Sequence, residues 1–169
     1  VRGEGIFLEF HEDVIASWAS LPDIKSRIAR LSNQYNQSRL SRELSPIKYD
    51  AKFVFLHTFV HNLIRQFSFD CGYGSAALRE RLSSNRSEGS EPMQAILIYT
   101  AAGDSEGTRG GLVRQGLPGN MESTISEAIR SANWCSNDPV CVESDGQGTD
   151  SANLAACHGC TLLPETSCE

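Results

Sequence analysis

The chain carries Trp134-Cys-Ser-Asn-Asp-Pro-Val-Cys141 and Ala156-Cys-His-Gly-Cys160, two stretches that hold four of its six cysteines. Two residues separate Cys157 from Cys160, a spacing at which both sulfurs of one tight turn can bind a single tetrahedral ion. Cys135 and Cys141 would supply the second pair, and Cys168 competes for the same role. Thiolates at this spacing predict a zinc site.

The choice of ligands stays open, because five cysteines exceed the four positions of a tetrahedral zinc. The alternative is two disulfides with spare thiols. We favour zinc because nothing in the sequence indicates secretion, and cytosolic thiols stay reduced. Cys71 lies 64 residues before the cluster and is expected to be a buried, small apolar residue.

Length and composition predict one domain with a small metal-held appendage. The 169 residues are 40% hydrophobic and 21% charged, as in an ordinary soluble domain. No membrane-spanning apolar run or signal peptide is visible, so we expect a cytoplasmic protein. Because the chain starts at Val1, we also expect it to be a piece of a larger protein.

Charge divides the chain into two unlike halves. Residues 1–86 hold 12 Lys and Arg against 9 Asp and Glu, whereas residues 87–169 hold 3 against 12. The acidic half contains the cysteine cluster, which argues against a phosphate-binding surface there. Any contact with nucleic acid should come from the first half.

The first half is expected to contain a strand and two long helices. Gly5–Phe10 reads as a strand, followed by a helical turn around Val14–Trp18. Ser20 and Asp23 form a predicted capping box for a helix that continues to about Leu44. Its polar face carries the candidate nucleic-acid contacts Arg27, Arg30, Arg39 and Arg42, although a solvated helix face is the more frequent reason for such a run.

Asp50 to Phe69 should be the central core helix, because large apolar residues recur at helical spacing there. His57 and His61 lie four residues apart and share one side of it, as a metal or catalytic pair would. Thr58 stands where a zinc protease needs glutamate, so we favour packing or hydrogen-bonding histidines.

The following residues predict a short helix, a loop, a strand and a glycine-rich turn. We expect a helix over Ala76–Leu82, a surface loop over Ser83–Pro92, and a strand at Ala95–Tyr99 inside a sheet covered on both faces. The loop Gly103–Gly111 comes after that strand and could cradle phosphate, with Arg109 as the supporting residue. Its two acids and its lack of a P-loop lysine favour a structural turn.

Beyond this loop, Asn120 is expected to cap a helix that runs to about Ala132 and delivers Trp134 and Cys135 to the cysteine cluster. The acidic run between Cys141 and Cys157 should be a solvent-exposed loop.

In their joint order these motifs resemble the MrfA Zn-binding domain family. The resemblance is carried by His57-Thr-Phe-Val-His61, Gly103-Asp-Ser-Glu-Gly-Thr-Arg-Gly-Gly111, the two cysteine stretches quoted first, and Glu165-Thr-Ser-Cys-Glu169, and it covers roughly Phe53 to Glu169. It implies a zinc bound by Cys135, Cys141, Cys157 and Cys160, with Cys168 as the alternate. The insertion between Cys141 and Cys157 is longer than the compact cysteine run typical of the family.

The resemblance also implies a function. Domains of this family accompany helicases, and the motif order is similar to that of a component of DISARM anti-phage systems. Such a component binds phage DNA together with a separate helicase subunit, DrmA. A DrmA-like helicase and DNA are therefore the expected partners.

We therefore expect an α+β fold, with an N-terminal segment at 1–49, a core at 50–134 and a cysteine-rich zinc segment at 135–169. The expected function is non-catalytic. One alternative is a nuclease or hydrolase that uses His57, His61, Asp104 and Glu106. Another is an adaptor whose acidic half binds a basic surface of a helicase.

Overall fold

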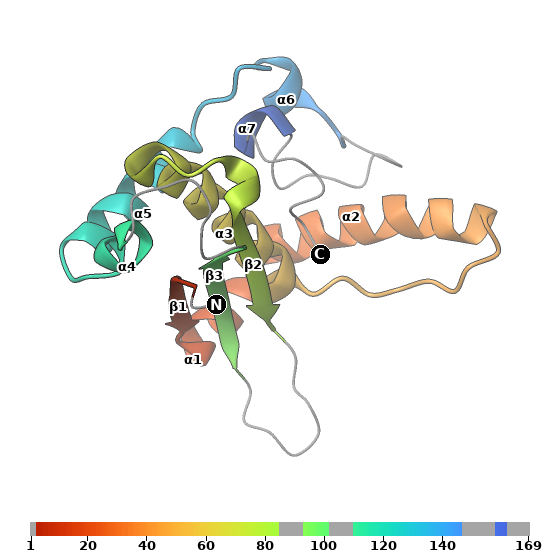
Figure 1. Ribbon diagram of the computed structural model, residues 1–169. Coiled ribbons are helices and arrows are strands. Elements are labelled where there is room, and N and C mark those ends of the chain that lie inside the picture. Colours follow the sequence, from red (N-terminus) through yellow and green to blue (C-terminus); the bar gives the residue numbers. More distant parts are fainter. Residues whose placement is uncertain (1–2, 85–92, 102–109, 147–157, 162–169) are drawn as a thin grey trace.

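A computed structural model describes residues 3–84, 93–101, 110–146 and 158–161. Helices pack against a small antiparallel sheet (Figure 1), which confirms the predicted α+β class. In chain order the elements are β1 (Gly5–Phe10), α1 (Glu12–Ala19), α2 (Pro22–Ser41), α3 (Ala51–Cys71), the 3-10 turn η1 (Ser75–Ala77), β2 (Leu78–Ser83), β3 (Gln94–Thr100), α4 (Gly111–Gln115), α5 (Asn120–Ser131), α6 (Val140–Glu143) and α7 (His158–Thr161). Within the described ranges, no helix has both the length and the apolar character required to span a bilayer.

Helix α3 is the centre of the core, as its apolar spacing predicts. Asp50 caps its N-terminus by accepting a hydrogen bond from the Lys52 amide, and Gly72 ends it in a left-handed conformation with φ of +72°. The apolar residues buried along one side of α3 are Leu56, Val60, Leu63, Ile64, Phe67 and Cys71. Because this row of side chains is sealed from water, we expect α3 to supply much of the stability of the fold.

The sheet has the strand order β1-β3-β2, with both pairs antiparallel. Ile6 pairs with Ile98 and Glu80 also pairs with Ile98, so these three side chains lie on one face of the sheet. The same face presents Leu78 and Ile96 to the core cluster that α3 completes. The sheet therefore packs its apolar inner face against α3.

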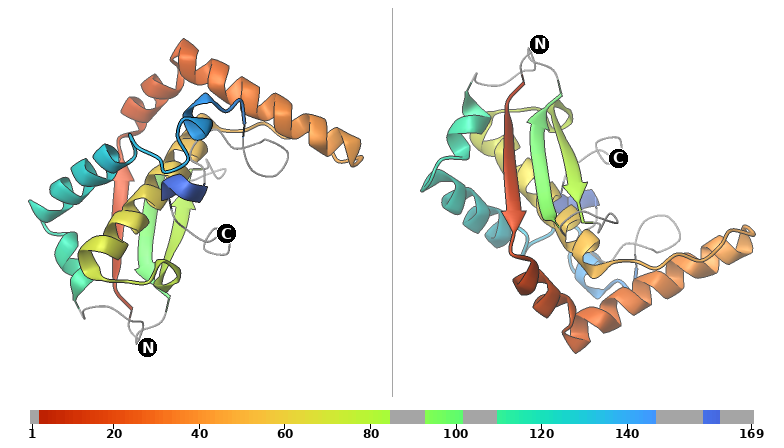
Figure 2. Two further views of the ribbon diagram at one scale, coloured as in Figure 1. Left: turned by 90° about the horizontal axis from the view of Figure 1, so that it is seen from above. Right: turned by 90° about the horizontal axis from the view of Figure 1, so that it is seen from below.

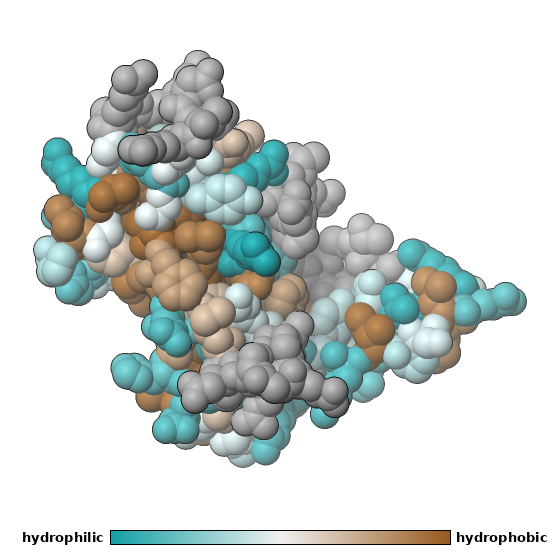
Figure 3. Space-filling model, turned by 60° about the horizontal axis from the view of Figure 1, so that its bottom comes forward, coloured by the Kyte–Doolittle hydropathy of each residue, from teal (hydrophilic) through white to brown (hydrophobic). Residues whose placement is uncertain are grey.

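The helices cover only this inner face, which corrects the prediction of a sheet buried on both sides. Figure 2 shows α3 on one side of the three strands and no described helix across the other. Phe7 is 54% exposed and Tyr99 is 37% exposed on that outer face, where apolar side chains gather in Figure 3. The continuous apolar run of β3 is explained instead by its central position between two strands.

The predicted helix at Ala76–Leu82 is wrong, because this segment is a 3-10 turn followed by strand β2. Leu78 and Glu80 are both buried, whereas Arg81 is exposed, so side chains alternate with the period of a strand. Pairing with β3 outweighs the helix propensity of the residues in this segment. This change places Glu80 on the face that packs against α3.

Two predicted helix caps are also wrong. Leu21 is the N-cap of α2, and the Ser20 hydroxyl instead donates a hydrogen bond to the Ser17 carbonyl at the end of α1. Gly119 is the N-cap of α5, where its amide donates to Glu122, while the side chain of Asn120 donates to the Arg114 carbonyl. In both cases a tight connection from the preceding helix decides where the next helix begins.

Helix α2 extends away from the rest of the fold (Figures 1 and 2), and Leu31 is its one buried residue. The segment after α2 runs back along this helix. The side chain of Asn36 holds it there through two hydrogen bonds with the backbone of Ile47, at 2.8 and 2.9 Å. Tyr35 and Tyr49 also meet edge to face. Most of α2 therefore remains accessible to a partner.

Candidate metal centre

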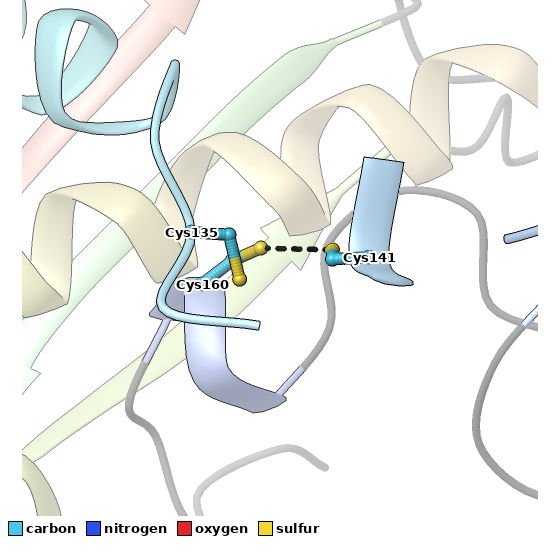
Figure 4. A group of neighbouring side chains, drawn as sticks. All are labelled: Cys135, Cys141 and Cys160. Atoms are coloured by element: carbon cyan, nitrogen blue, oxygen red, sulfur yellow. Dashed lines mark hydrogen bonds between the residues drawn. The ribbon is translucent and has the colours of Figure 1, made fainter. Parts of the chain in front are cut away.

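Three cysteine side chains from separate parts of the chain converge beside α3. Cys135 follows α5, Cys141 lies in α6 and Cys160 lies in α7, and Figure 4 shows their sulfurs turned toward a common point. All three Sγ atoms lie within 4.8 Å of one another, and the Cys141 and Cys160 sulfurs are 3.6 Å apart. Helix α7 contacts α3, so the site rests on the core of the fold.

The distances fit a shared metal ion and exclude a disulfide between these residues. A disulfide bond is about 2.05 Å long. Two thiolates on a tetrahedral zinc, each at about 2.3 Å, stand about 3.8 Å apart. No disulfide joins any two of the described cysteines, which are Cys71, Cys135, Cys141 and Cys160.

The loop between Cys135 and Cys141 is held in shape by one carboxylate. Asp138 accepts a hydrogen bond from the Cys135 amide at 3.0 Å and another from the Val142 amide at 3.2 Å. The amide of Asn137 donates a hydrogen bond to the Cys135 sulfur at 3.4 Å. Asp138 thus holds the backbone that positions Cys135 and Cys141.

Replacing Asp138 with alanine should therefore weaken metal binding without removing a ligand. Partners that orient metal ligands contribute about 10–100-fold in affinity, and we expect a loss in this range. Competition against a chromophoric zinc chelator measures the effect. The matched control is Glu143→Gln, since Glu143 is an exposed acidic residue of the same segment. Equal affinities for the two variants would contradict the positioning role of Asp138.

The remaining predicted ligands lie outside the described residues. Cys157 precedes α7 directly and Cys168 follows it, and the structure places neither. The identity of the fourth ligand therefore remains a prediction. Asp104, Glu106 and Arg109 of the glycine-rich loop are likewise outside the described ranges.

Cys71 behaves as the sequence predicts, as a buried residue of the core rather than a ligand. It closes α3 and belongs to the main hydrophobic cluster. Burial raises the pKa of the Cys71 thiol, and the nearby Asp70 carboxylate raises it further. A thiol in this setting stays protonated and unreactive near neutral pH.

His57 and His61 both lie against Glu80, a residue that the sequence pattern did not single out. Glu80 of β2 lies opposite them, with its Oε1 atom 3.0 Å from His61 Nε2 and 3.5 Å from His57 Nε2. The two imidazole rings meet edge to face with centroids 4.3 Å apart. This confirms the prediction of hydrogen-bonding histidines.

Burial opposes ionisation of Glu80, but hydrogen bonds from His57 and His61 outweigh it and hold the pKa of this carboxyl below its usual range. Glu80 is thus a buried carboxylate that the two histidines keep charged. The alternation of Leu78, Glu80 and Leu82 indicates a strand with Glu80 on its inner face, but the prediction of a helix over this segment does not use that pattern.

The four candidate arginines of α2 do not share one environment. Arg30 forms an ion pair with Asp145 at 3.1 Å, and the Arg39 Nε donates to the Ser45 carbonyl at 2.7 Å. Asp145 follows α6, so this ion pair links α2 to the segment that carries Cys141. A role of these arginines in nucleic-acid binding stays a prediction.

Comparison with known proteins agrees with the geometry of the cysteine site. The family model of the MrfA Zn-binding domain matches residues 59–161. The chain is also 36% identical over 173 residues to the DISARM protein DrmB of Bacillus paralicheniformis, an alignment that covers 100% of this chain and 30% of DrmB. The similarity thus extends through the N-terminal segment, and the chain spans less than a third of the relative's length. The chain belongs to the MrfA Zn-binding domain family.

Proposed function

We propose that this chain is a non-catalytic zinc-binding domain whose zinc is bound by Cys135, Cys141, Cys157 and Cys160, with Cys168 as the alternate for one position. The observation that supports this is the convergence of three cysteine sulfurs from three separate segments. Four thiolates fill a tetrahedral sphere and leave no position for water or substrate. The zinc would therefore be structural, joining α6 and α7 to the face of α3.

The domain would serve a larger, helicase-associated DNA-binding protein of an anti-phage defence system. Membership of the MrfA Zn-binding domain family and the similarity to the DISARM protein DrmB support this assignment. A helicase subunit of the DrmA type would be the partner, and helicase activity would reside there or in the rest of the protein. The cytoplasm is the compartment that would keep the thiols reduced.

Direct contact with DNA would come from α2, through Arg27, Arg30, Arg39 and Arg42. Helix α2 extends beyond the body of the fold, where it can reach a second molecule (Figure 2). The cysteine-bearing half of the chain is acidic, so it would not attract phosphate.

Binding of the chain to single- and double-stranded DNA across a salt series tests this contact. The logarithm of the affinity should fall linearly with the logarithm of salt, with a slope of about −0.9 per phosphate on duplex DNA. Arg27→Ala and Arg42→Ala should each reduce the slope by about one. Arg130→Ala is the matched control, because Arg130 is an exposed arginine on α5 that pairs locally with Glu127.

A flat salt response with no DNA affinity would contradict direct contact by α2. Capture of the DrmA-like helicase that is lost at raised salt would then favour the adaptor function instead, since screening weakens attraction between an acidic domain and a basic surface. Metal analysis that finds no zinc in the freshly purified chain would contradict the proposed domain function itself.

A further inference from the structure

The cluster of His57, His61 and Glu80 has the geometry of a second metal site. One nitrogen from each ring and one carboxylate oxygen all lie within 4.8 Å of one another. In a tetrahedral site with ligands at about 2.0–2.1 Å, neighbouring ligand atoms stand about 3.3 Å apart. The two measured distances to Glu80 Oε1, 3.0 and 3.5 Å, lie on either side of this value.

Hydrogen bonds to the two histidines satisfy only one of the two carboxylate oxygens of Glu80. Both histidines direct Nε2 at the same oxygen of Glu80, while its other oxygen, Oε2, is buried and has no hydrogen-bond partner in the described structure. The side chain of Glu80 is only 3% exposed, so water does not replace the missing partner at the surface. Buried carboxylates in proteins are paired or bind metals. A cation would engage this carboxylate more fully than the two rings do.

The fold places these three groups together through two independent elements. His57 and His61 are four residues apart on α3, which puts both rings on one side of the helix. Glu80 is on the face of β2 that packs against α3. The spacing on the helix and the alternation on the strand thus aim three potential ligands at one point between them.

We propose that His57, His61 and Glu80 bind a divalent transition-metal ion, with zinc as the physiological candidate, at a site separate from the cysteine cluster. Imidazole and carboxylate ligands suit zinc, and three protein ligands leave a fourth position for water. The side chain of His57 is 31% exposed, which gives that position access to solvent. The ion would link β2 to α3 and would neutralise the charge of Glu80. The two metal groups share no residue.

Metal analysis of the full chain tests the proposal, using zinc alone as the probe. After dialysis against buffered zinc, the wild type should hold two ions per chain. Glu80→Gln keeps the size and a hydrogen-bonding oxygen but removes the charge, and it should lose one ion, with an affinity loss above the roughly 100-fold of an outer-shell change. His11→Gln is the matched control, since His11 is an exposed histidine outside the cluster, and it should keep both ions.

Cys160→Ser separates this site from the cysteine site. The variant should lose the thiolate-bound ion and keep the histidine-bound ion. Cobalt substitution reports which site is filled, because thiolate-to-cobalt charge transfer is absent from a site of two imidazoles and a carboxylate. If the cysteine site fails, the wild type holds one ion that Glu80→Gln loses. If the present proposal fails, the one ion is lost in Cys160→Ser and kept in Glu80→Gln.

Folding is checked by circular dichroism for each variant. Should Glu80→Gln fail to fold, His57→Gln decides, because this change leaves the hydrogen bond between His61 and Glu80 in place. Loss of one ion from folded His57→Gln supports the site. Zinc content equal to that of the wild type in either folded variant overturns it.

Discussion

Removal of zinc by a chelator is expected to abolish amide exchange protection around Cys141 while α3 keeps its protection. The amides of Cys141 and Glu143 bond to the carbonyls of Asn137 and Pro139 in a short segment with little apolar burial of its own. Structural zinc contributes about 10–16 kcal/mol to small zinc domains, so folding of this segment should depend on the ion. Hydrogen exchange read by mass spectrometry should show at least about a 100-fold loss of protection there.

The matching cysteine variants make this result specific. Cys160→Ser should reproduce the effect of the chelator, because it removes one of the three converging sulfurs. Cys71→Ala removes a thiol that belongs to the core, and it should retain the zinc and the protection around Cys141. Unchanged exchange in Cys160→Ser, or an equal loss in Cys71→Ala, would contradict the assignment of the cysteine site.

Phe67→Ala is expected to cost about 3–5 kcal/mol in the free energy of unfolding, because it opens a cavity in the core between α3 and the sheet. Phe67 is among the largest fully buried side chains of the described structure. It lies in the same cluster as Ile96 and Ile98 of β3, so its loss affects the contact between helix and sheet. Urea denaturation followed by circular dichroism measures the change, with the slope m held as a check on two-state behaviour.

The control for this prediction is the neighbouring phenylalanine on the same helix. Phe69 is 66% exposed and its ring makes a surface contact with Arg65, so Phe69→Ala should cost less than about 1 kcal/mol. Helix propensity changes equally in the two variants, which leaves burial as the difference. Similar costs for both substitutions would contradict the central place of α3 in the core.

Zinc removal and the Phe67→Ala variant also test the two candidate metal sites, because α3 supports both the cysteine cluster and the cluster of the two histidines with Glu80. It carries His57 and His61 directly, and α7 with Cys160 lies against it (Figures 1 and 4). A loss of stability in α3 should therefore weaken metal binding at both places. Zinc removal, in contrast, should unfold the cysteine segment and leave α3 folded.

The elements that could be predicted are those whose signal is local. Strand β1, helix α3 and strand β3 appear where their apolar patterns place them, since a helical or strand-like period is set by neighbours in sequence. The helix caps near Ser20 and Asn120 were predicted wrongly, because the backbone path from the preceding helix decides the cap. The segment of β2 was also predicted wrongly, since pairing with β3 overrides its local preference.

The residue types of the candidate sites can be read from the sequence: cysteines at a spacing that suits zinc, and two histidines on one side of a core helix. Which of these residues meet depends on the folded chain. Cys135 and Cys160 lie 25 positions apart, and Glu80 lies 19 positions after His61, so no local rule relates them. Both β2 and α7 pack against α3, and this packing depends on burial across the whole chain rather than on neighbouring residues.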